Sequence, residues 1–288
     1  MAGAEHPVKA LNRPGILLIL AAALGLTAPA SASPPPLQLE GRLVQAGYAI
    51  GRTEPGARIL VDGQPAGAAS ADGLFIIGFD RDSPASVDLR VKTASGETER
   101  RLEIAPGTFD IQRIDGLPED QVTPTDPTLL ARIAAERQRK AVGFASQAEG
   151  TNFSQGFILP VEGARLTARF GGQRILDGEP KQPHYGDDLA APVGTPVAAP
   201  AAGVVAFAET GLHYEGGLIM IDHGQGLISL YLHLSRVDVA AGQSVARGQV
   251  IAAVGQEGRA TGPHLCWRLK WRGRNLDPLL LVRGSPIE

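Results

Sequence analysis

The chain has 288 residues and a formal net charge of −3, from 27 basic and 30 acidic side chains. It lacks the basic excess that attracts nucleic acid, so no nucleic-acid partner is expected. With 36 glycines and 22 prolines, turn-forming residues are far above their usual share of about 12%, which argues against a helical bundle. A single cysteine, Cys266, excludes any intramolecular disulfide.

Residues 1–32 have the pattern of a secretory signal peptide. Lys9 and Arg13 precede an apolar run over 16–26, and the small residues Ala30-Ser31-Ala32 precede three prolines. The apolar run is shorter than the roughly 20 residues that a bilayer span requires, which disfavours a membrane anchor. We therefore expect cleavage near Ala32 and an exported mature chain, periplasmic or secreted, with no transmembrane segment.

Residues 37–105 read as a small β-sandwich module. Short β-rich runs over 58–61, 74–77 and 87–91 are separated by turn signals such as Asp62-Gly63. Nothing in this stretch is typical of catalytic chemistry. We interpret it as a positioning or partner-binding module that could meet cell-wall or division proteins.

A connector over 106–156 should contain one helix at about 127–140. Thr125 or Asp126 can cap this helix, because Pro127 is a favoured first helical residue. One face carries the apolar residues Leu129, Leu130, Ile133 and Ala134. The other face is expected to be solvated, and it carries the charged residues Arg132, Glu136, Arg137, Arg139 and Lys140.

From 157 to 282 the pattern changes to short apolar strands broken by glycine. The predicted strands cover 166–170, 204–208, 218–222, 227–232, 249–254 and 265–271. Alternating strands and helices are absent from this pattern, and so is a phosphate-binding loop. The sequence therefore predicts a mainly β fold, in which a small sandwich and a helix precede a glycine-rich antiparallel β-domain.

The first motif with chemical potential has the form H-x-G-x-D. It consists of His184, Gly186 and Asp188, and glycine would allow a tight backbone turn that aims both side chains at one point. Imidazole nitrogen and carboxylate oxygen are both zinc ligands. The motif therefore indicates part of a metal site.

Two further motifs lie on predicted strands. Side chains alternate between the faces of a strand, which would put Tyr231 and His233 on one face, and His264 beside Cys266 on one face. Tyr231 could orient a reacting group or be a buried structural residue. Two other histidines, His213 and His223, are read as structural, since a lone histidine is seldom a ligand.

In their joint order these motifs resemble the M23 family of zinc metallopeptidases, the LytM or lysostaphin-like enzymes. The resemblance extends over about 157–277 and includes Gly194-Thr195-Pro196-Val197 and Ile221-Asp222-His223-Gly224. It implies that zinc is held by His184, Asp188 and Cys266, and that His233 and His264 are catalytic. The family usually has histidine at the last ligand position, where this chain has Cys266.

The resemblance implies an exported zinc metalloendopeptidase that hydrolyses peptide cross-links of bacterial peptidoglycan, with peptide stems as substrate. The alternative is a catalytically weak or inactive LytM-type domain that binds cell wall or activates cell-wall amidases. Thiolate is also a good zinc ligand, and four of the five site positions match, so the enzyme is favoured.

The Cys266 exchange predicts a change in pH dependence. A His, Asp, Cys ligand set carries two negative charges, against one for the usual set, so zinc should acidify water less effectively. We expect the parent chain to have a higher pH optimum or a lower rate than Cys266→His. Hydrolysis rates of both proteins across pH test this, and coinciding profiles would contradict it.

Overall fold

The computed structural model describes residues 1–4, 36–116 and 123–283. The expected signal peptide lies almost entirely outside these residues. Residues 1–32 and 33–288 are separate units, and the second is compact. Among the described residues, none of the helices has both the length and the apolar character that crossing a membrane requires.

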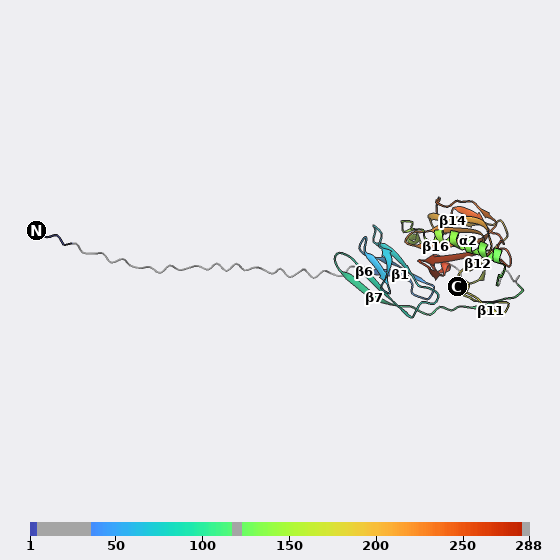
Figure 1. The fold of residues 1–288 in the computed structure, drawn as a ribbon, viewed down its shortest axis with the longest axis horizontal. Coiled ribbons are helices and arrows are strands. Elements are labelled where there is room, and N and C mark those ends of the chain that lie inside the picture. Colours follow the sequence, from blue (N-terminus) through green and yellow to red (C-terminus); the bar gives the residue numbers. More distant parts are fainter. Residues whose placement is uncertain (5–35, 117–122, 284–288) are drawn as a thin grey trace. The chain divides into compact units, whose positions relative to one another are not determined.

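The N-terminal part of the compact unit is built from two antiparallel sheets (Figure 1). One has the order β1-β2-β5 and the other β4-β3-β6-β7. The strands are β1 (Gln38–Arg42), β2 (Tyr48–Arg52), β3 (Arg58–Val61), β4 (Gln64–Ala68), β5 (Leu74–Gly78), β6 (Ser86–Lys92) and β7 (Glu97–Glu103). The turn between β3 and β4 uses Asp62 and Gly63, both with positive φ, as expected for a two-residue hairpin.

The C-terminal part centres on a sheet with the order β18-β14-β15-β16-β20-β12-β9, to which β21 adds by pairing with β20. Its strands are β9 (Arg165–Ala168), β12 (Asp187–Ala190), β14 (Gly203–Leu212), β15 (Gly216–Asp222), β16 (Leu227–Leu234), β18 (Ser244–Val245), β20 (His264–Trp271) and β21 (Arg274–Leu276). A smaller sheet joins β13 (Pro196–Ala198), β19 (Val250–Ala253) and β17 (Arg236–Val237). Short 3₁₀ turns cover Asn152–Gln155 and Pro278–Leu281. The prediction of a mainly β fold is confirmed.

The central strand β16 is buried along its whole length because both faces of the sheet are covered. Side chains of Ile228, Leu230 and Leu232 join one apolar cluster, whereas Leu227 and Tyr231 join the other. This alternation follows from the two-residue period of a strand. The first cluster also contains Cys266, so it marks the face of the sheet to which Cys266 belongs.

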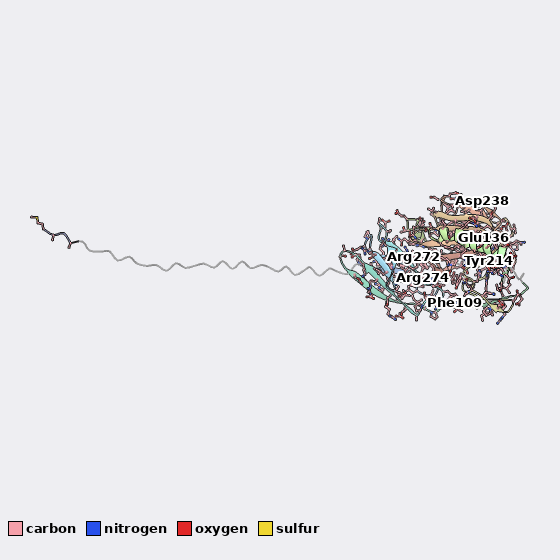
Figure 2. The ribbon with its side chains drawn as sticks, in the orientation of Figure 1. Phe109, Glu136, Tyr214, Asp238, Arg272 and Arg274 are labelled. Carbon is pink, nitrogen blue, oxygen red and sulfur yellow. The ribbon has the colours of Figure 1, made fainter. Side chains whose placement is uncertain are left out.

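The larger apolar cluster runs without a break from the N-terminal sheets into the C-terminal part, and contains Phe75 as well as Trp267. Polar contacts reinforce this junction. The Arg274 guanidinium, labelled in Figure 2, donates to the Gly78 carbonyl, and the Asp277 N–H donates to the Ala46 carbonyl. The two predicted modules therefore share one core.

The connector supplies a strand and a helix to the compact unit. Strand β8 (Ile111–Ile114) pairs in parallel with β10 (Gln173–Leu176), which in turn pairs with β11 (Glu179–Pro180). Helix α2 (Pro127–Phe144) begins at the expected proline, and Asp126 accepts a hydrogen bond from the Leu129 N–H as its cap. The helix, green in Figure 1, packs against β14.

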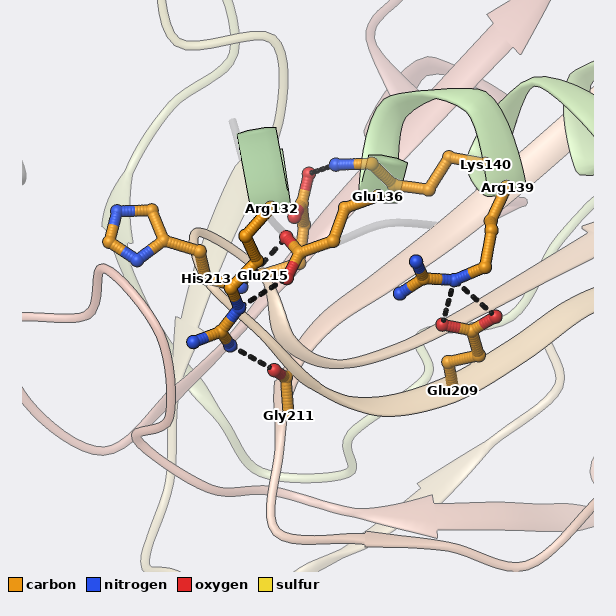
Figure 3. A network of polar contacts seen from close by, with 8 residues as sticks. All are labelled: Arg132, Glu136, Arg139, Lys140, Glu209, Gly211, His213 and Glu215. Carbon is orange, nitrogen blue, oxygen red and sulfur yellow. Dashed lines mark hydrogen bonds and ion pairs between the residues drawn. The ribbon is translucent and has the colours of Figure 1, made fainter. Parts of the chain in front are cut away.

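The expected faces of the helix are only partly right. The charge pattern puts Glu136 on the solvated face, yet it is buried, whereas Leu130 on the expected apolar face is 45% exposed. Glu136 accepts hydrogen bonds from Arg132 Nε and from the His213 backbone N–H (Figure 3). Its burial depends on these tertiary partners, which helical periodicity alone does not reveal.

Further polar contacts hold α2 to the sheet (Figure 3). Arg139 pairs with Glu209 at 3.0 Å and Lys140 pairs with Glu215 at 2.5 Å. Gly143 allows the close approach, because a Cβ there would lie 2.8 Å from Phe207 Cβ. These two ion pairs and the close approach at Gly143 therefore hold the helix against the sheet.

Removing the Glu136 carboxylate should destabilise the protein. Glu136→Ala leaves the His213 N–H without its acceptor in a mostly buried place, so we expect the free energy of unfolding to fall by about 1–3 kcal/mol. Urea denaturation measures this loss. The matched control Glu209→Ala removes a more exposed ion pair and should cost less than about 1 kcal/mol. Equal losses in the two variants would contradict the docking role of Glu136.

Candidate metal centre

The antiparallel register of β12 and β20 brings the first two candidate ligands together. Asp188 lies directly opposite Cys266, and Ala190 lies opposite His264. Residues opposite each other in a ladder share a face, so Asp188 and Cys266 project to the same side of the sheet. His264 precedes Cys266 by two residues on the same strand and shares that side.

The third candidate ligand, His184, lies just before β12 and is held by its backbone. Its N–H donates to the Gly172 carbonyl, and its own carbonyl accepts from the Gly171 N–H. The imidazole Nε2 lies 3.3 Å from Cys266 Sγ and 3.1 Å from Asp188 Oδ1. One donor atom from each of the three residues lies within 4.8 Å of the other two.

The two separations from His184 Nε2 are close to those expected around a tetrahedral zinc ion. Zinc–nitrogen and zinc–oxygen bonds near 2.0 Å and a zinc–sulfur bond near 2.3 Å place the donor atoms about 3.3–3.6 Å apart. Apart from its ion-pair contact with His184, the buried Asp188 Oδ1 accepts no hydrogen bond among the described residues, although buried carboxylate oxygens normally do. A metal bond would satisfy this atom, so the three residues fit the ion that their chemistry suggests.

The chain bends at Gly186, as expected, but the reason for glycine differs from the one expected. Gly186 does not have the positive φ that favours glycine. Instead it lies against β20, where a Cβ would come within 2.8 Å of the Trp267 carbonyl and 3.1 Å of Cys266 Sγ. Glycine is needed here for a close approach between the loop of His184 and the strand of Cys266.

The expectation that Tyr231 and His233 share a face is also wrong. The pairing of β15 with β16 shifts between Gly217 and Ile219, and His233 adopts a left-handed backbone with φ of 66°. This bulge turns His233 toward the site, where its ring centroid lies 4.8 Å from that of His264. Bulges often redirect a side chain in this way, and alternation along one strand cannot reveal them.

Tyr231 instead belongs to the opposite face and to a buried polar chain. The His223 Nδ1–H donates to the Ala202 carbonyl, so its Nε2 accepts from the Ser229 hydroxyl. The Ser229 oxygen in turn accepts from the Tyr231 hydroxyl at 2.7 Å. His223 and Tyr231 thus have structural partners. His213 has its ring against Tyr214, consistent with its structural reading.

Both candidate catalytic histidines have one fixed tautomer. His233 Nδ1 lies 2.7 Å from the Glu257 carbonyl, and His264 Nδ1 lies 2.8 Å from the Gly262 carbonyl. A carbonyl oxygen can only accept, so each Nδ1 carries the proton and each Nε2 of the neutral ring is left as a base. His264 Nε2 lies 3.6 Å from Asp188 Oδ1.

Burial dominates the ionisation of the site. It lowers the pKa of His184 to about 4 and, with help from neighbouring His264, the pKa of His233 to about 3. For Asp188, burial opposes ionisation, but the contact with His184 outweighs it and holds the pKa at about 2. Burial raises the pKa of the Cys266 thiol to about 12 despite nearby Arg268. Metal binding at this thiol must therefore displace a proton.

A cleft of about 340 Å³ opens onto the site. Asp188, His233 and His264 line it, whereas His184 and Cys266 lie below its surface. Its walls also carry three arginines, Arg113 of β8, Arg174 of β10 and Arg259. None of these arginines was expected from the sequence, since they lie far apart along the chain and carry no motif.

Comparison with known proteins identifies the region of the site. The family model "Peptidase family M23" matches residues 182–278. The crystal structure of a Pseudomonas aeruginosa protein assigned to peptidase M23 superposes with a TM-score of 0.65 at 30% identity, covering 85% of this chain and 96% of that one.

Two curated relatives match the same part of the chain. Peptidoglycan DD-endopeptidase ShyA of Vibrio cholerae is 44% identical over 117 residues, which are 40% of this chain and 27% of ShyA. DD-carboxypeptidase/endopeptidase Mpg of Neisseria meningitidis is 38% identical over 129 residues, which are 45% of this chain and 30% of Mpg. The match thus spans less than a third of either relative's length.

The buried hydrogen-bonded chain of His223, Ser229 and Tyr231 should have a structural role. Tyr231→Phe removes a buried donor to Ser229, so we expect the free energy of unfolding to fall by about 1 kcal/mol while metal content stays unchanged. Thermal denaturation and metal analysis of the purified variant measure both effects. Loss of metal without loss of stability would instead place Tyr231 in the metal centre.

Proposed function

Because this chain belongs to peptidase family M23, we propose that it is an exported zinc metalloendopeptidase that hydrolyses peptide cross-links of bacterial peptidoglycan. The proposal rests on one observation above the others. Donor atoms of His184, Asp188 and Cys266 lie within 4.8 Å of one another, directly beside His233 and His264. The printed names of the relatives, DD-endopeptidases among them, support peptidoglycan peptides as the substrate.

In this proposal His184, Asp188 and Cys266 would hold zinc, and the substrate would approach through the cleft. Zinc, when bound, supplies a Lewis acid that polarises the scissile carbonyl and acidifies a water molecule. Three protein ligands leave the ion a coordination position for that purpose. The exposed edge of Asp188 and the two histidines mark where the peptide would lie.

His233 and His264 supply the proton chemistry. Their Nδ1–H groups are fixed on backbone carbonyls, so each Nε2 can take a proton from water or, once protonated, donate to the developing oxyanion. The two roles are shared between these residues. Burial keeps His233 neutral near pH 7, so its Nε2 starts without a proton.

Metal content and peptidoglycan digestion test the proposal together. We expect about one zinc ion per chain in the parent, and a clear loss of zinc in Cys266→Ala because a ligand is removed. His264→Ala should keep its zinc but lose cleavage by at least about 100-fold, the usual contribution of an acid–base group. Metal analysis and chromatography of released muropeptides provide the two readings.

His213→Ala is the matched control, because His213 is a histidine of the same domain that does not line the cleft. It should retain both zinc and cleavage. A parent chain that holds no zinc and releases no product would contradict the enzyme and favour a wall-binding or amidase-activating domain. Equal zinc in the parent and Cys266→Ala would remove Cys266 from the site.

A further inference from the structure

The substitution of thiolate for imidazole at the third ligand raises an electrostatic problem. Asp188 and Cys266 would each carry a negative charge at a place where Cys266 is only 1% exposed. Charges that are withdrawn from water need a partner or a metal ion. A metal site with one anionic ligand would therefore need an added positive charge to accommodate a second anionic ligand.

Arg268 lies where such compensation is needed. It follows Cys266 by two residues on β20 and so projects to the same face. Its Nε–H donates to Cys266 Sγ with a nitrogen–sulfur distance of 3.4 Å. Within the described residues, no carboxylate lies within ion-pair distance of Arg268, whereas the thiol of Cys266 accepts a hydrogen bond from it.

The stem of Arg268 is held against the ligand loop. A Cβ on Gly186 would lie only 2.7 Å from Arg268 Cγ and 3.1 Å from Cys266 Sγ. The backbone between His184 and Asp188 therefore packs directly on the arginine that contacts the third ligand. The guanidinium is positioned by the same close approach that assembles the three ligands.

We propose that Arg268 is a positioning residue of the zinc centre, whose N–H···S hydrogen bond orients Cys266 and offsets the charge of its thiolate. A His, Asp, Cys set with one arginine has a net charge of −1, the same as a His, Asp, His set without it. Hydrogen bonds to ligating atoms commonly tune a metal centre in this way. The inference rests on the metal site of the proposed function and extends it to a residue outside the ligand set.

Arg174 has a related but separate position. Its guanidinium nitrogen lies 3.9 Å from Asp188 Oδ2, and the residue lines the catalytic cleft. Arg268 instead lines a separate cavity, together with Lys140, Glu215 and Lys270. Because Arg268 does not line the cleft, the effects of substituting it can be attributed to the metal centre and not to direct contact with a substrate.

The test measures zinc affinity of the full chain, by competition with a chromophoric chelator, in two backgrounds. In the parent, Arg268→Met should weaken zinc binding at least tenfold, because the thiolate loses its hydrogen-bonded counter-charge. In Cys266→His, the same change should alter affinity less than twofold, or strengthen it, because a cation beside a neutral ligand only repels zinc. Arg268→Lys retains charge without the Nε–H and should lie between.

Cobalt substitution gives a reading that does not depend on activity. The parent should show a thiolate-to-cobalt charge-transfer band, which Arg268→Met shifts to lower energy because the sulfur lone pairs lose a hydrogen bond. Lys270→Met is the matched control, since Lys270 lines the same cavity two residues further along the strand. It should leave the zinc affinity within twofold of the parent and the cobalt band unshifted.

Three outcomes would overturn the inference. They are an unchanged zinc affinity in Arg268→Met, an equal loss of affinity in the parent and Cys266→His backgrounds, and an unshifted cobalt band. Circular dichroism of Arg268→Lys, the milder change, separates these outcomes from misfolding. If zinc binds as expected but peptidoglycan is not cleaved, the proposed function fails while the role of Arg268 stands.

Discussion

The pairing of β12 with β20 is the constraint on which the rest of the site depends. It sets Asp188 opposite Cys266, and it leaves His264 and Arg268 two residues away on either side of Cys266. A shift of this register by one residue would send Asp188 to the opposite face of the sheet. The relative position of Asp188 and Cys266, two of the three proposed ligands, is therefore specified by backbone hydrogen bonds between two strands.

The surrounding structure keeps this pairing rigid from several directions. Strand β16 pairs with the other edge of β20 and brings Leu232 opposite Cys266. The larger apolar core extends beneath these strands into the N-terminal sheets, where Phe75 belongs to the same cluster as Trp267. The N-terminal module thus helps to support the C-terminal sheet, in addition to any role in binding partners. Donor atoms can be held in place only on such a scaffold.

Much of this organisation could be predicted from local sequence. The strands and the residues of the H-x-G-x-D and G-P-H-x-C motifs follow from short-range periodicity, and Arg268 lies at the next position of the same two-residue period. His233 was found by its motif, but the face it occupies depends on a bulge against β15. The burial of Glu136 depends on the His213 N–H, 77 residues away. Local patterns contain no information on such long-range partners.

The contribution of strand β8 to the cleft could not be predicted from local sequence either. Arg113 becomes part of its wall only because β8 pairs with β10, and nothing in the connector's sequence indicates a parallel strand. The connector thus contributes a cation to the place where substrate would lie. A segment expected to be a linker is part of the wall of the cleft.

The close packing of Gly186 on Arg268 has a consequence for how this centre could have evolved. Any side chain at position 186 would displace the arginine, and a bulkier residue at 268 would press on the loop of His184. Glycine at 186 is needed whatever residue lies at 268, because the same Cβ would also come within 2.8 Å of the backbone carbonyl of Trp267. A change of the third ligand is therefore constrained by a backbone contact that no substitution at 268 can relieve.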